Sequence, residues 1–228
     1  MRSGGSKTLE IEVLAVGDAR VAILPAVRGL VAEGERVRRG IDEVAPKAIA
    51  LTVGREELAA LEAYDGSDHP PANWEEELYV AGLAQWGEVR KPPPCFVEAV
   101  RVAKERGLAL RALDFNDEDY TEAYIRHVTA WDLIFHSRVE KKARDHAFTA
   151  TTPEEFVLEF DAIVADPEGY ATLERARERH FAKRIAKLAR NHPSLLAVVE
   201  RERASGVRAA LDAEGGNPAL RPSPAREK

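Results

Sequence analysis

Two arginines stand where apolar segments end, in positions that could do chemistry. Arg28 closes the run ILPAVRG, and Arg203 lies in the run LLAVVERERASGV. Such apolar runs are typical of buried strands, and Gly29 and Gly206 predict a turn after each, with a helix following. Ligand sites of α/β sheets lie at these strand-to-helix junctions. A guanidinium group placed there can bind a carboxylate or a phosphate through paired hydrogen bonds.

Carboxylates accompany both arginines. Glu200 and Glu202 lie beside Arg203, and Asp114 follows a third apolar run. Each could act as an acid or a base in catalysis. The same carboxylates could instead form ion pairs with the arginines that only hold the edge of the sheet together. Asp114 also opens an acidic stretch that suits either a polar site or the start of a helix.

The other reactive residues give weaker signals. No two of the six histidines have the i,i+4 spacing of a helical metal site. Asp132 and His136 do have that spacing and predict a local pair. The single cysteine, Cys95, has no obvious base partner and is expected to be a buried bystander. Glycine-rich nucleotide loops and the Gly-x-Ser-x-Gly turn of serine hydrolases are absent, so we expect no cofactor.

Composition excludes several classes of protein. The 228 residues carry a formal net charge of −6, which argues against a general nucleic-acid or membrane-surface partner. The basic segment 173–190 also carries an apolar stripe, so its cations are expected to form the solvated side of a helix. One cysteine and no long apolar segment indicate a soluble cytoplasmic protein.

Hydrophobic patterning predicts the elements that position these residues. Strands alternate with helices, and this order favours one mostly parallel α/β sheet flanked by helices. A helical insertion over about residues 117–191 precedes the last strand. We predict one domain over 8–213, with flexible tails at 1–7 and 214–228. The expected strands are 9–16, 20–25, 47–53, 108–115 and 195–200, and the other expected helices are 33–46, 55–64, 73–89, 95–107 and 204–213.

The layout resembles the TraB/PrgY/GumN family, which is related to the Tiki and erythromycin-esterase-like hydrolases. The segments 37–61, 108–117 and 195–207 are similar to its helix–strand–helix, its middle strand and its final strand. In the late helix RERHFAKRIAKLA, Arg177 matches the family pattern and Phe181 stands in the place of methionine. The resemblance covers nearly all of residues 9–212 and implies a metal-dependent hydrolytic centre of histidines and a glutamate.

The functional positions depart from that pattern. Arg28 stands in the place of the first motif histidine, Arg203 in the place of the second, and Thr52 in the place of the glutamate. A guanidinium group offers no lone pair to a metal, whereas a divalent ion needs imidazoles and carboxylates. We therefore expect no metal site in this chain.

Three functions remain open. The first is a TraB-like binding or regulatory pseudoenzyme. In the second, the site is rebuilt as a clamp for a small anionic ligand or a peptide. The third is a metal-dependent hydrolase or peptidase of the TraB/Tiki type with an altered site. A homodimer is compatible with all three. The candidate ligand-binding residues are Arg28, Thr52, Asp114, Arg177, Glu200, Glu202 and Arg203.

Overall fold

The computed structural model, which describes residues 9–215, is built on a five-stranded sheet of order β1-β2-β5-β3-β4. β1 pairs antiparallel with β2, and the other neighbouring strands are parallel. The predicted mostly parallel α/β fold is thus confirmed. The strands are β1 (Glu12–Val16), β2 (Ala19–Ala26), β3 (Ala48–Leu51), β4 (Ala109–Ala112) and β5 (Ser194–Glu200).

The helices follow the predicted order with changed ends. They are α1 (Ala32–Val44), α2 (Arg55–Glu62), α3 (Trp74–Leu83), the 3-10 turn η1 (Ala84–Trp86), α4 (Pro94–Arg106), α5 (Asp117–His127), α6 (Ala130–Asp145), α7 (Pro153–Val164), α8 (Glu168–Ala189) and α9 (Arg201–Gly215). The helix expected over 73–89 is shorter, because its last turn tightens into η1 before Gly87. None of the helices in the described part of the chain is long and apolar enough to cross a bilayer.

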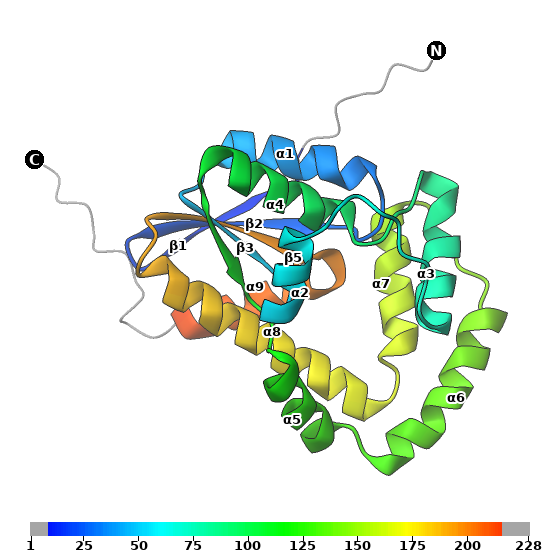
Figure 1. Cartoon of the computed structure of the whole chain (residues 1–228). Coiled ribbons are helices and arrows are strands. Elements are labelled where there is room, and N and C mark those ends of the chain that lie inside the picture. Colours follow the sequence, from blue (N-terminus) through cyan, green and yellow to red (C-terminus); the bar gives the residue numbers. More distant parts are fainter. Residues whose placement is uncertain (1–8, 216–228) are drawn as a thin grey trace, which may run out of the picture.

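Two helical layers cover the sheet (Figure 1). On one face, α1 and α4 pack through buried residues such as Ile41 and Phe96. On the other face, α8 and α9 contribute Phe181, Ile185 and Val207. Both layers meet strands whose side chains are almost entirely buried, such as those of β3 and β5. This burial on both faces explains why these strands are continuous apolar runs in the sequence.

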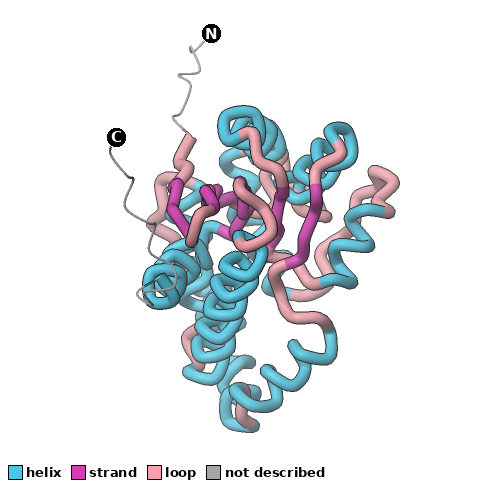
Figure 2. Tube along the Cα trace, turned by 90° about the vertical axis from the view of Figure 1, so that its left-hand side faces the viewer, coloured by secondary structure: helices cyan, strands magenta, loops and turns pink. Residues whose placement is uncertain are grey.

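The predicted insertion is helical, but only part of it is a cap. In Figure 1, α5 and α6 lie below the sheet and away from it, and Figure 2 likewise shows helices below the strands, whereas the second half of α8 lies against the sheet. The apolar stripe of α8 is buried at Leu173, Phe181 and Ile185, as predicted from its spacing. α8 therefore joins the cap to the sheet and brings its charged residues to the sheet's edge.

The two predicted tails lie mostly outside the described residues. Residues 1–7 and 216–228 lie outside the described range, so the structure does not test the prediction of flexible tails there. Residues 214 and 215 are part of α9 instead of the tail.

Candidate functional site

The parallel strands end side by side and bring the predicted site residues to one edge. Ala26 at the end of β2 is paired with Glu200 at the end of β5, and Arg28 follows two residues later. The backbone N–H of Glu200 donates to the hydroxyl of buried Thr52, at 3.4 Å, directly after the end of the neighbouring β3. Asp114 lies beyond β4, where its backbone N–H donates to the carbonyl of Val53. Segments far apart in sequence therefore form one site.

Arg28 is paired with the two glutamates predicted as its ion-pair partners. Its Nη1 lies 3.0 Å from Glu200 Oε1, and its Nη2 lies 2.9 Å from Glu202 Oε1. The two glutamate side chains are about 5% exposed, whereas the Arg28 side chain is 40% exposed. Gly29, with φ of +99°, turns the chain directly after it. Arg28 therefore has one side on buried carboxylates and another accessible to solvent.

Arg203 is held differently from Arg28. Its side chain is 7% exposed and forms ion pairs with Asp161, with Glu174 at 3.4 Å and with Glu178 at 3.3 Å. The carboxylates of Glu200 and Glu202 act electrostatically on both Arg28 and Arg203, so the two arginines belong to one cluster. However, Arg203 is buried among cap and sheet helices, and its guanidinium group is already occupied by carboxylates.

Arg177 completes the cluster from α8. It forms an ion pair with Asp114, lies 2.8 Å from Glu174 and lies 4.0 Å from Glu200. Glu174 thus contacts both Arg177 and Arg203, and Glu200 contacts both Arg28 and Arg177. The shared carboxylates link all three arginines into a continuous network.

Carboxyl groups outnumber guanidinium groups in this network. Three arginines contact six acidic side chains, namely Asp114, Asp161, Glu174, Glu178, Glu200 and Glu202. Glu57 also interacts electrostatically with Arg28, Arg177 and Glu200. Burial raises the pKa of Glu202, because a desolvated carboxylate is costly, and nearby Arg28 offsets this only in part. Burial likewise raises the pKa of Asp161 and of Glu178. The local environment is therefore acidic and favours proton retention by some of these groups.

A cavity of about 320 Å³ opens beside Arg28. Its wall includes Tyr79 of α3, whose ring lies 5.7 Å from the Arg28 guanidinium carbon. Glu57 of α2 and the basic residues Arg90 and Lys91 also line it. Two buried atoms of the wall residues, Arg28 Nε and the Tyr79 hydroxyl oxygen, have no hydrogen-bond partner in the described part of the chain. Unsatisfied buried polar atoms are rare and call for an explanation.

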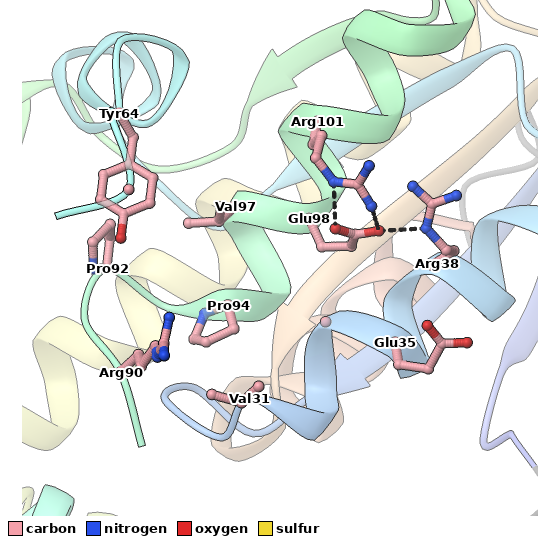
Figure 3. A pocket seen from close by; sticks show the side chains of 12 residues that line it. Val31, Glu35, Arg38, Tyr64, Arg90, Pro92, Pro94, Val97, Glu98 and Arg101 are labelled. Atoms are coloured by element: carbon pink, nitrogen blue, oxygen red, sulfur yellow. Dashed lines mark hydrogen bonds and ion pairs between the residues drawn. The ribbon is translucent and has the colours of Figure 1, made fainter. Parts of the chain in front are cut away.

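A second cavity of about 350 Å³ lies between α1 and α4 (Figure 3). Its guanidinium groups are engaged with carboxylates, since Arg38 and Arg101 both contact Glu98, at 2.5 and 2.6 Å. Arg90 lines both cavities. The second cavity contains none of the predicted site residues, and its wall has none of the unsatisfied buried atoms found around the first.

Two local predictions are wrong. Gly206 lies within α9, not in a turn, because β5 leads directly into a helix that begins at Arg201. A side chain at Gly206 would overlap the carboxylate of Glu178, so glycine here serves close packing. Asp132 and His136 do not pair. Asp132 forms a capping box with Thr129, and His136 lies 3.0 Å from Glu75.

Two other predictions are confirmed, namely the burial of Cys95 and the start of a helix in the acidic stretch after Asp114. Cys95 is fully buried, and desolvation raises the pKa of its thiol. In the acidic stretch after Asp114, Asn116 caps α5 by accepting from the backbone N–H of Asp119. The acidic residues Asp117–Asp119 form the first turn of that helix, where negative charge is favourable.

Five site residues were not found from the sequence. They come from α2, from α3 and from the cap, and they are Glu57, Tyr79, Asp161, Glu174 and Glu178. A signal for two of them was present: Glu174 and Glu178 lie on the same helical face as the apolar stripe of α8. Charged residues on a buried face imply buried partners.

No group of three or more metal-binding side chains is placed to hold an ion among residues 9–215. The chain matches no family model and no curated protein.

Proposed function

We propose that this chain is a TraB-like binding or regulatory protein that does not use metal-dependent catalysis. In this proposal Arg28 and Arg203 take the places of the motif histidines, and guanidinium groups supply the positive charge that a metal would otherwise give to the carboxylates. The support is the network itself, in which each of the three arginines contacts at least two acidic side chains.

The observation that carries the proposal is the contrast between Arg28 and Arg203. Arg203 is buried and occupied by three carboxylates, so a clamp made of both arginines is disfavoured. Arg28 is 40% exposed and lines a cavity. The ligand in this proposal therefore places an anionic group, such as a carboxylate, against Arg28.

Two measurements test this function together. Metal-free protein is dialysed against Zn²⁺ or Mn²⁺, and bound metal is counted by elemental analysis. We expect no tightly held ion, and one retained ion per chain would overturn the proposal. A thermal-shift screen of small carboxylates and phosphates then compares the wild type with Arg28→Gln, and we expect stabilisation of the wild type only.

An altered TraB/Tiki-type hydrolase is the second candidate. It is favoured by Glu202, a buried carboxyl group with a raised pKa beside Glu200, since such a group can act as a general acid. Hydrolysis of a peptide library that is lost in Glu202→Gln but kept in a matched surface variant, Glu62→Gln, would support this candidate over the first.

We also propose that the protein forms a homodimer through α6. Trp131, Ile134 and Phe135 are 69%, 54% and 44% exposed and follow the i, i+3, i+4 spacing of one helical face. Together they expose on the order of 300 Å² of apolar surface, the size at which patches mark interfaces. Antiparallel pairing of two α6 helices would place Trp131 of one copy against Arg138 of the other, a favourable cation–aromatic contact.

A further inference from the structure

The cavity beside Arg28 offers groups of both charges to a ligand. Its basic residues are Arg28, Arg90 and Lys91, and its acidic residues are Glu57, Glu75 and Glu76. The acidic residues on α3 are engaged, because Glu76 lies 2.5 Å from Lys91 and Glu75 pairs with His136. Glu57 has no ion-pair partner within 4 Å among the described residues.

Glu57 stands close to the same network that holds Arg28. Its carboxyl group interacts electrostatically with Glu200, Arg28 and Asp114. Glu57 is exposed to solvent, and partial desolvation, followed by the charge of Glu200, raises the pKa of its carboxyl group. A cation placed beside Glu57 would relieve both effects. A ligand that carries a positive group as well as an anionic group would therefore gain an interaction that a purely anionic ligand lacks.

We propose that the ligand of this cavity is a zwitterion of the free amino-acid type. Its carboxylate meets the exposed part of the Arg28 guanidinium group, and its ammonium group meets Glu57. This inference rests on the proposed binding function and names its ligand class. The Arg28 side chain is 40% exposed and lines the cavity, so it is accessible to such a carboxylate.

The remaining walls fit the side chain of such a ligand. Val80, Val89 and Phe160 line the cavity between the charged groups, which favours an apolar substituent. The volume of about 320 Å³ is at the lower end of the range of small-molecule sites. An aliphatic or aromatic amino acid is therefore a better match than a nucleotide or a long peptide.

Isothermal titration calorimetry of the full chain tests the inference. The probes are L-leucine and L-phenylalanine, their N-acetyl derivatives, which lack the ammonium group, and their amides, which lack the carboxylate. We expect a free amino acid to bind and both derivatives to bind at least about tenfold more weakly, because each leaves a charged group of the site without its partner.

Substitutions at Glu57 and Arg28 test which residue contacts which group of the ligand. Glu57→Gln should weaken binding of the free amino acid about tenfold and leave binding of the N-acetyl derivative unchanged. Arg28→Gln should weaken binding of both. Glu56→Gln, a change at the neighbouring exposed position, is the matched control and should bind as the wild type does. Thermal unfolding of each variant verifies that it is folded.

The outcomes separate the two proposals. Equal binding of the free and N-acetylated forms overturns the zwitterion and leaves the anion-binding function intact. Binding of inorganic phosphate at Arg28 with no binding of amino acids also overturns the zwitterion and leaves the anion-binding function intact. If neither amino acids, their derivatives nor phosphate bind, the inference and the proposed binding function both fail.

Discussion

Arg28 and Glu202 are 174 residues apart in sequence, yet Arg28 Nη2 donates to Glu202 Oε1 at 2.9 Å. The contact joins the end of the second strand to the first turn of the last helix, across the parallel pairing of β2 with β5. Because the glutamate is buried and the arginine is half exposed, the pair links the interior of the network to the cavity. The following predictions test what each part of this network does.

Arg203→Met should destabilise the fold strongly. The change leaves Asp161, Glu174 and Glu178 without their shared partner, and removal of one member of a buried ion-pair group costs about 3–5 kcal/mol. The control is Arg175→Met, since Arg175 pairs with Glu168 on the surface and should change the free energy of unfolding by less than about 1 kcal/mol. Urea denaturation measures both. A loss of ligand binding without a loss of stability would instead restore Arg203 to the binding site.

Gly206→Ala should destabilise the protein although alanine is the better helix former. The added methyl group would overlap the Glu178 carboxylate and displace it from Arg203. We expect a net loss of about 1–3 kcal/mol, as for other overpacked sites. Ser205→Ala, at the exposed neighbouring position of α9, is the control and should be nearly neutral. A Gly206→Ala protein as stable as the wild type would show that Glu178 is free to move.

Glu202→Gln should change how stability depends on pH. Burial raises the pKa of Glu202 above the ordinary value of 4.5. A carboxyl group with a raised folded-state pKa contributes most stability below its unfolded-state pKa, and this contribution is lost as the pH rises through its folded-state pKa. Between pH 5 and pH 8 the wild type should therefore lose stability relative to Glu202→Gln. Denaturant titrations of both proteins at the two pH values measure this difference, and a constant difference contradicts the assignment.

Trp131→Glu should convert the proposed dimer to a monomer. A carboxylate at the centre of a buried apolar contact would be desolvated without a partner. Sedimentation equilibrium should show a dimer for the wild type and for Leu158→Glu, which alters another exposed apolar residue, on α7. A monomeric wild type at all tested concentrations would contradict the α6 interface.

Cys95 should be unreactive in the folded protein. Its side chain is fully buried, and burial raises the pKa of the thiol, so little thiolate is exposed to a reagent. Ellman's reagent should label no more than a trace of native protein and one thiol per chain after unfolding in guanidinium chloride. Rapid labelling without denaturant would indicate that α4 opens locally.

The sequence by itself determined the class of fold and half of the site. Apolar runs identified β2, β3 and β5, and helical spacing identified the stripe of α8, because these patterns record burial along one element. Since parallel strands end at one edge, the strand pattern was enough to predict that Arg28, Asp114, Glu200, Glu202 and Arg203 lie at one edge of the sheet. Thr52 and Arg177 were predicted from the family resemblance.

Only the tertiary structure decided how these residues differ. Arg28 and Arg203 have similar local sequences, yet one lines a cavity and the other is buried, because α7 and α8 close over the second and not the first. The sequence of a segment does not show whether a helix distant in the chain covers it. The same reason explains why Asp161, Glu57 and Tyr79 were missed, and why Gly206 indicated a turn: its true neighbour, Glu178, lies on another helix.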